Sequence, residues 1–305
     1  MFARAAISQF TQPGDVVFDP FMGGGTTLVE ARAAGRRAVG TDINSLSLFV
    51  SRVKTTVMTE QDLSEVSAWV EMLAQGLNLR EPVERDLAWI EKGYHRNIST
   101  RKTWPIRKLL EMSLSTLDLL STRKQQRFAR CVLLRTAQWA LDCRREIPSA
   151  RLFREQMLRS LQEMLVGARG FAAAASAVVA RRPVCLHQSA ATVHENWDRL
   201  KLPPPRLIVT SPPYPGVHVL YHRWQVQGRR ETPAPYWIAN SLDGDGASFY
   251  NFGGRKQPGL TGYYDAASSA FKSIARIADS RTFVVQMIAF NEPSWQLPAY
   301  LETME

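Results

Sequence analysis

The stretch "DVVFDPFMGGGTTLVEARAAGRRAVGTDIN", residues 15–44, contains the pattern that decides the fold. A short apolar run over residues 15–20 leads into a Gly-rich turn, and the next segment has helical periodicity up to Gly35. A second apolar run follows over residues 37–43. Strand, tight turn, helix and strand in this order predict a βαβ unit, whose crossover is expected to be right-handed.

Three later segments, residues 183–190, 206–213 and 281–290, also have the pattern of buried strands. Between residues 59 and 182 strand signals are scarce and helical patterns dominate. The sequence therefore predicts an α/β fold: a doubly wound, mostly parallel, Rossmann-like sheet with a large α-helical insertion. We expect residues 1–58 and 183–305 to form the sheet domain and residues 59–182 to form the insertion.

Composition limits the class of protein. The chain has 305 residues, of which 45% are hydrophobic, so it is long enough to bury a real core. No apolar run reaches the roughly 18 to 20 residues of a membrane span, and the N-terminus lacks a signal-peptide core. We expect a cytoplasmic protein with no membrane partner. The cysteines and histidines lack metal-ligand spacing, so no metal site is predicted.

The net charge of +10 is concentrated in one part of the chain. Residues 83–182 hold 20 Lys and Arg against 9 Asp and Glu, whereas the remainder holds 18 against 19. Such a concentration suits binding to a phosphate backbone, since each neutralised phosphate releases counterions. A solvated helical surface would have the same charge pattern.

The Gly-rich turn "DPFMGGGTT" has the features of a cofactor site. Glycines between a strand and a helix let the backbone approach a ligand, and Asp42 at the end of the next strand is placed to bond ribose hydroxyls. No Gly-Lys-Ser/Thr closes the turn, so it is not a P-loop. Thr26 and Thr27 stand where a dinucleotide fingerprint has its third spaced glycine. The spacing therefore favours a nucleoside cofactor.

Residues 210–214, "TSPPY", end a buried strand on two prolines, which lack N–H groups and fix their own φ. Together with "DPFMGGGTTLVEA" and "GTDIN", this motif resembles those of the AdoMet-dependent DNA amino-methyltransferases. The resemblance covers roughly residues 10–57 and 183–290 and implies that AdoMet is the cofactor of the sheet domain. In the family, the methionine part is held at the position of Asp19 and the Gly-rich turn, and the ribose at the position of Asp42. The family often has Asp in its adenine motif, where this chain has Ser189. The expected cofactor-binding residues are Asp19, Phe21, Gly23, Gly25, Thr26, Thr27, Asp42, Asn44 and Ser189.

The expected catalytic residues are Ser211, Pro212, Pro213 and Tyr214. An exocyclic base amine is a poor nucleophile until acceptors draw its hydrogens out of plane. The Ser211 hydroxyl and the Pro212 carbonyl can do this on a backbone that the prolines fix. Tyr214 is expected to stack on a target base flipped out of double-stranded DNA. Because Ser, rather than Asp or Asn, precedes the prolines, cytosine N4 is favoured over adenine N6.

DNA contacts are expected from two places outside the sheet. One is the basic insertion, with its mixture of cations and aromatics near residues 94–108, and the other is a long loop after Tyr214 that runs to Gly262. The candidate residues are Arg101, Lys102, Arg107 and Lys108 in the insertion, and Arg223, Arg229, Arg230, Arg255 and Lys256 in the loop.

Two alternatives stay open. RNA guanine-N2 methyltransferases share a Gly-rich "DPF" turn and a Pro-Pro-Tyr strand end, but commonly carry Asp where this chain has Ser211. The chain also looks short, since the family's sheet normally finishes with a C-terminal hairpin that is expected to be missing here. A non-catalytic AdoMet-binding or DNA-binding subunit of a split methyltransferase is therefore the other alternative. Expected partners are DNA, and either a complementary subunit or a paired restriction endonuclease.

Overall fold

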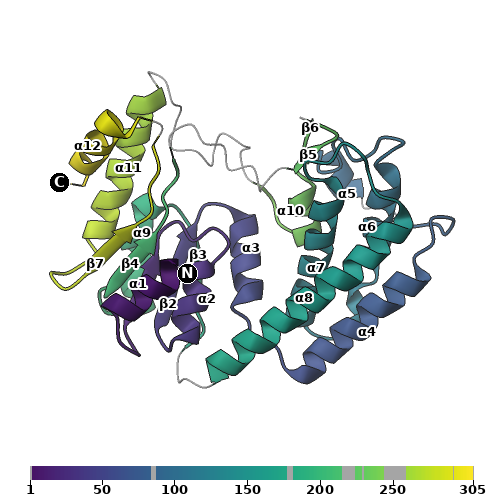
Figure 1. Cartoon of the computed structure of the whole chain (residues 1–305), viewed down its shortest axis with the longest axis horizontal. Helices are drawn as coiled ribbons and strands as arrows, with labels where there is room; N and C mark the ends of the chain where they lie inside the picture. Colours follow the sequence, from purple (N-terminus) through teal and green to yellow (C-terminus); the bar gives the residue numbers. More distant parts are fainter. Residues whose placement is uncertain are drawn as a thin grey trace. The chain divides into compact units, whose positions relative to one another are not determined.

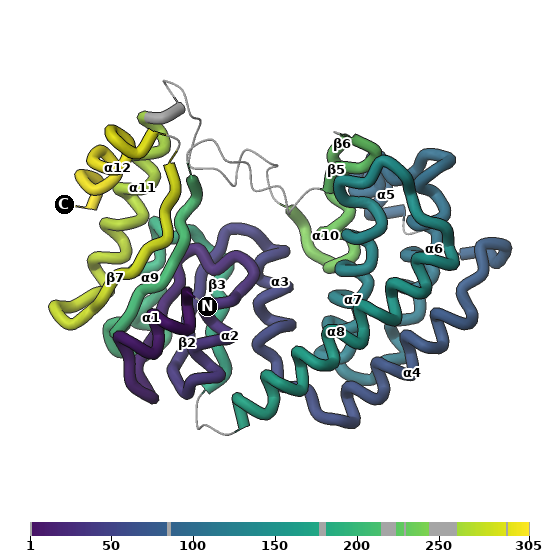
Figure 2. The backbone as a smooth tube through the Cα atoms, in the orientation of Figure 1, coloured from purple at the N-terminus to yellow at the C-terminus, as the bar shows by residue number. Residues whose placement is uncertain are grey.

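The computed structural model describes residues 2–83, 87–176, 181–214, 224–228, 230–243, 259–290 and 292–304. The chain divides into two compact units, and Figure 2 traces the backbone through both. The sheet unit comprises residues 1–55, 173–219 and 244–305, and the helical unit comprises residues 56–172 and 220–243.

The sheet unit contains a five-stranded sheet in the order β3-β2-β1-β4-β7, in which every pairing is parallel (Figure 1). The predicted α/β class with a mostly parallel, Rossmann-like sheet is confirmed, and each predicted strand is present. The elements are α1 (Phe2–Phe10), β1 (Val16–Asp19), α2 (Thr26–Ala33), β2 (Arg37–Asp42), α3 (Ser45–Lys54), β3 (Val184–His187), α9 (Val193–Trp197), β4 (Leu207–Thr210), α11 (Gly259–Ala275), β7 (Phe283–Gln286) and α12 (Pro293–Glu302), with short 3-10 turns at Ala190–Thr192 and Asp198–Leu200.

Helices cover both faces of this sheet because its strands are apolar on both sides. Val17 packs in a core with α1, α2 and α3, whereas its neighbour Phe18 packs in a second core with α9, α11 and α12. Alternate side chains of a strand point to opposite faces, so an unbroken apolar run such as β1 is buried only between two helical layers.

The strand order reverses between β1 and β4. From β1 the chain moves outward through β2 to β3, and it then returns to place β4 on the other side of β1. In open α/β sheets, ligands bind outside the carboxyl ends of the strands at such a switch point. This edge of the sheet receives both the Gly-rich turn after β1 and the Ser-Pro-Pro-Tyr turn after β4.

The helical unit is built around α7, which packs against α4, α6 and α10. Its helices have the boundaries that capping predicts: Thr59 and Thr122 each form a capping box at the start of α4 and α7. The elements are α4 (Glu60–Gly76), α5 (Leu87–Glu91), α6 (Trp104–Ser115), a 3-10 turn (Leu117–Leu119), α7 (Arg123–Leu141), α8 (Ala150–Ser176), β5 (Trp224–Val226), β6 (Arg230–Thr232) and α10 (Ala234–Ala239).

The prediction of one long loop from Tyr214 to Gly262 was wrong for its described part. Residues 224–232 include the antiparallel hairpin β5–β6, and α10 follows. Strands of three residues are too short for periodicity to detect, and they are stabilised here because Trp224 and Val226 are buried. The predicted domain limits assigned residues 220–243 to the sheet domain, whereas the structure groups them with the helical unit.

Among the described helices, none combines the length and the apolar character that crossing a membrane requires. After β7, the described chain continues into α12.

Candidate cofactor and catalytic site

Asp19 and Thr210 meet at the switch point. Each ends its strand, β1 and β4, and the Thr210 hydroxyl donates a hydrogen bond of 2.7 Å to Asp19 Oδ1. The same oxygen accepts the N–H of Phe21 at 3.1 Å. Burial raises the pKa of Asp19 to about 6, although these bonds act in the opposite direction. When Asp19 is ionised, its hydrogen bonds therefore replace only part of the hydration that burial removes from the carboxylate.

The Gly-rich turn is tied to the neighbouring strand and helix through its own backbone. The Gly23 N–H donates to Asp42 Oδ2 at 2.9 Å, and the Ser51 hydroxyl donates to the Gly23 carbonyl at 3.0 Å. Lys54 Nζ donates to the carbonyl of Gly24 at 2.9 Å. These contacts fix the turn from β2 and α3, so its shape does not depend on local sequence alone.

Gly25 and Gly24 occupy different surroundings. Gly25 has φ +74°, and a Cβ there would lie 2.5 Å from Ser51 Oγ. Gly24 is exposed, and a Cβ there would meet only Lys54 Nζ, at 3.6 Å. Gly25 is therefore required by conformation and packing. Gly24 leaves space above the turn, at the N-terminus of α2, where Thr26 is exposed and Thr27 is buried.

Asp42 joins the turn to the start of α3. Its Oδ1 accepts the Asn44 N–H at 2.8 Å, while its Oδ2 accepts from Gly23. Burial raises the pKa of Asp42, and the two N–H bonds counteract this. Each carboxylate oxygen can accept a second bond, so capacity for ribose hydroxyls remains.

Two other predicted cofactor residues have structural partners. Asn44 is buried and caps α3, accepting the Leu46 N–H at 2.8 Å. Ser189 is exposed near the end of β3 and accepts the Ala191 N–H at 3.2 Å. The turn and Ser189 follow strands at the same edge of the sheet, where Asp19 ends β1 and Asp42 ends β2.

The predicted catalytic motif follows β4 directly. Ser211 is exposed, Pro212 is buried, and Pro213 and Tyr214 are partly buried. The Tyr214 hydroxyl donates to the carbonyl of Met287, just after β7, at 3.2 Å. The ring is therefore held from the next strand of the sheet.

The predicted DNA-contacting residues separate into distinct groups. Arg107 is buried and its Nη1 lies 2.9 Å from Glu111 Oε1, so its assignment to a phosphate-binding surface is corrected to a structural ion pair. Lys108 donates to the Leu79 carbonyl at 2.7 Å. Arg107 therefore lies on the buried side of α6, whereas Lys108 is partly buried and reaches the Leu79 carbonyl from the adjacent position. Arg101, Lys102 and Arg230 are exposed, whereas Arg223, Arg229, Arg255 and Lys256 lie outside the described residues.

Four residues at this site were missed from the sequence: Thr210, Ser51, Lys54 and His187. His187 pairs in register with Asp42 on the neighbouring strand, and its charge favours the ionised form of that aspartate. Ser51 and Lys54 share one side of α3, which is a recognisable signal once the helix is placed against the turn. Thr210 required knowledge that β4 lies beside β1.

Comparison with known proteins agrees with this geometry over the N-terminal stretch. Residues 2–48 match a family described as DNA methylase. A Type II methyltransferase, M.MvaI, from Kocuria varians is 52% identical over 48 residues, which cover 16% of this chain and 11% of that protein. Another, M.MjaII, from Methanocaldococcus jannaschii is 38% identical over 53 residues, covering 17% of this chain and 10% of the relative.

The aligned stretches span about a tenth of either relative. The family match over residues 2–48 contains α1, β1, the Gly-rich turn, α2 and β2. Over residues 2–48, the chain is similar to the DNA methylase family of N6- and N4-methyltransferases.

Proposed function

We propose that the chain is an AdoMet-dependent DNA methyltransferase that modifies an exocyclic base amine. The observation that carries this proposal is the hydrogen bond between Thr210 and Asp19. It joins Asp19, the first residue of the cofactor-type turn, to the residue directly before Ser211. Two motifs far apart in the sequence therefore lie at one edge of the sheet, as transfer between a cofactor and a base requires.

The residues present fit AdoMet. A buried carboxylate whose pKa is raised to about 6 gains from an ammonium partner, and Asp19 would hold the amino group of the methionine part. The N-terminus of α2, beside the open space at Gly24, suits its carboxylate. Asp42 retains acceptor capacity for the ribose. When bound, AdoMet supplies a methyl group on a positively charged sulfonium.

The Ser-Pro-Pro-Tyr turn would prepare the base. The exposed Ser211 hydroxyl and the Pro212 carbonyl would accept the two amine hydrogens and make the nitrogen lone pair available. Tyr214, held at its hydroxyl by Met287, would present its ring to a flipped base. We favour cytosine N4 over adenine N6 because Ser precedes the prolines.

The test is methyl transfer from labelled AdoMet to duplex DNA, followed by digestion and mass spectrometry of the nucleosides. We expect N4-methylcytosine. Ser211→Ala should lower turnover while AdoMet affinity by calorimetry stays near that of the unmodified protein. N6-methyladenine would correct the base, and methylated guanosine in RNA would replace the substrate class. No transfer to any nucleic acid, with AdoMet still bound, would favour a non-catalytic subunit.

A further inference from the structure

Two segments of the helical unit meet a third segment, the hairpin β5–β6. The Cys143 N–H donates to the Gln225 carbonyl at 2.9 Å, and the Gln227 N–H donates to the Arg144 carbonyl at 3.1 Å. From the loop before α6, Asn97 Nδ2 donates to the Glu231 carbonyl at 2.7 Å. We call this surface the hairpin platform: residues 92–102, residues 142–145 and the strands β5 and β6.

The backbone of the platform is held in costly conformations. Asn97, Cys143 and Gln227 have φ of 62°, 54° and 49°, in the left-handed region that residues with a Cβ usually avoid. Among the other described residues, the only non-glycine positions with positive φ are Lys201 and Asn240. Strain of this kind persists where surrounding bonds over-determine it, and it is frequent at binding sites. Backbone and side-chain hydrogen bonds therefore join these segments into one structure.

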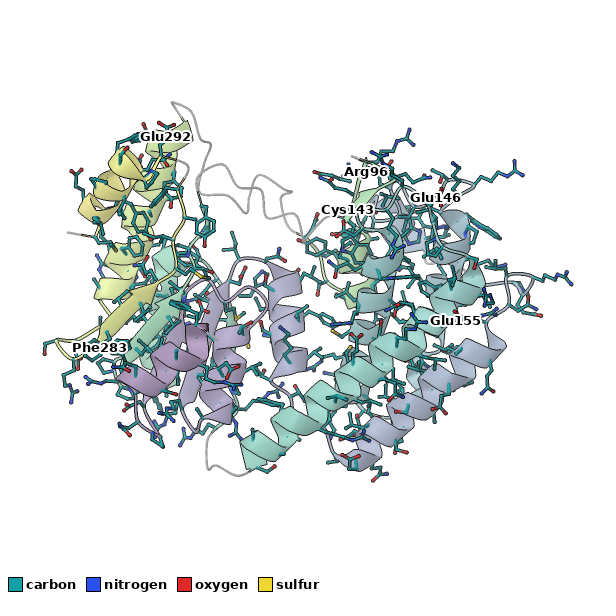
Figure 3. The ribbon with its side chains drawn as sticks, viewed as in Figure 1. Arg96, Cys143, Glu146, Glu155, Phe283 and Glu292 are labelled. Carbon is teal, nitrogen blue, oxygen red and sulfur yellow. The ribbon has the colours of Figure 1, made fainter. Side chains whose placement is uncertain are left out.

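Exposed cations project from each of the three segments: Arg96, Arg145 and Arg230. None of these three is in an ion pair with another described residue. Residues 92–102 contain four Lys or Arg and no Asp or Glu. Arg96 and Cys143 are labelled in Figure 3, at the end of the helical unit where Figure 1 shows β5 and β6.

Acidic side chains near the platform are fewer than the cations, and one of them is hydrogen-bonded within it. Asp142 Oδ1 accepts the Gln225 N–H at 3.0 Å, so that carboxylate stabilises the hairpin. Glu231 is partly buried beside Arg230, and Glu146 is exposed. The exposed surface is thus mainly cationic.

We propose that the hairpin platform binds the sugar-phosphate backbone of the duplex DNA that this protein methylates. The proposal rests on the proposed function for its substrate class. Guanidinium groups suit phosphate oxygens, and contacts to phosphate fix the register of a protein on a duplex. Because hydrogen bonds already join the segments, those contacts need less ordering of loops on binding.

The experiment compares two triple variants of the full chain, in each of which three positive charges are removed. Arg96→Gln, Arg145→Gln and Arg230→Gln remove charge from the platform. The matched control, Arg80→Gln, Arg123→Gln and Arg159→Gln, removes exposed cations elsewhere in the same unit. Binding to a fluorescently labelled duplex oligonucleotide is measured by anisotropy over a range of salt concentrations, and AdoMet binding by calorimetry.

For the platform variant we expect weaker binding and a salt slope shallower by about 0.9 for each DNA phosphate that is no longer neutralised. The control should keep the slope, and both variants should bind AdoMet normally. Equally weakened binding in the two variants, or unchanged binding in the platform variant, would overturn the proposal, as would failure of the unmodified chain to bind duplex DNA. Because binding is measured without methyl transfer, weaker binding confined to the platform variant supports the surface even if the chain methylates nothing.

Discussion

Asp19 holds a carboxylate where water is excluded and where Asp42 adds a like charge. Bonds from Thr27, Thr210 and Phe21 recover only part of the lost hydration, so the pKa stays raised at about 6. A protein that keeps such a group ionised at neutral pH loses stability unless a cation joins it. Under the proposed function, the amino group of AdoMet is that cation.

Asp19→Asn should therefore stabilise the ligand-free protein while weakening AdoMet binding. The folded pKa lies above the ordinary value of 3.8, so the folded state binds more protons between about pH 4 and 6 and stability falls as pH rises through this window. Above about pH 6 the full penalty applies, on the order of 3 kcal/mol for a shift of about 2 units. Denaturant unfolding at pH 4 and pH 8 measures this. We expect Asp19→Asn to have a higher free energy of unfolding than the unmodified protein at pH 8 but not at pH 4. A difference that is the same at both pH values would contradict the role given to the Asp19 charge.

Thr210→Val should raise the pKa of Asp19 further, because it removes a hydroxyl that stabilises the ionised form. The Phe21 N–H and the like charge of Asp42 are unchanged in this variant. We expect the pH midpoint of AdoMet affinity, followed by calorimetry, to move upward. Thr210→Ser keeps the donor and should leave the midpoint near that of the unmodified protein. Equal midpoints in Val and Ser variants would remove Thr210 from this role.

At the scale of elements, the Gly-rich turn is a junction of four segments. It links β1 to α2, and hydrogen bonds from β2 and α3 hold its backbone. A glycine is needed only where φ is positive or where another segment of the same chain would collide with a Cβ atom. Gly25 meets both conditions and Gly24 meets neither.

Gly25→Ala should lower the free energy of unfolding by about 2–4 kcal/mol, since it adds left-handed strain to a clash with Ser51. Gly24→Ala is the matched control and should stay within about 1 kcal/mol of the unmodified protein. Urea unfolding checks both. If Gly24→Ala folds normally but binds AdoMet poorly, the space above Gly24 is occupied by ligand; comparable destabilisation of the two variants would show that the turn differs from the described geometry.

At the scale of the molecule, cofactor-type residues lie in the sheet unit and the excess positive charge lies in the segment that forms most of the helical unit. Ligand binding protects the amides that it orders and those coupled to them. We expect AdoMet to slow hydrogen exchange in residues 16–27, 37–47 and 207–214. Exchange in α6 and α7 should be unchanged. Protection confined to the helical unit would contradict the proposed cofactor site.

The fold was largely predictable because its strands and helices carry local signals. Apolar runs and the Gly-rich turn are signals that span only a few residues. Each strand of the sheet that they predict is present. The hairpin β5–β6 was not predictable, since strands of three residues depend on pairing with Cys143 and Arg144 from a distant segment. Arg107 was predicted to contact DNA because a count of charges does not distinguish a surface cation from one that is buried and paired with Glu111.

The βαβ unit, the cofactor-type turn and the Ser-Pro-Pro-Tyr strand end follow from local sequence, because short-range periodicity and the backbone limits of Gly and Pro define them. Three features depend on the folded chain: the bond from Thr210 to Asp19, the contacts of Ser51 and Lys54 with the turn, and the set of cations that remain exposed. These depend on which strands become neighbours and which side chains lose water. Both are set by burial across the whole core, over distances in the chain that no local pattern spans.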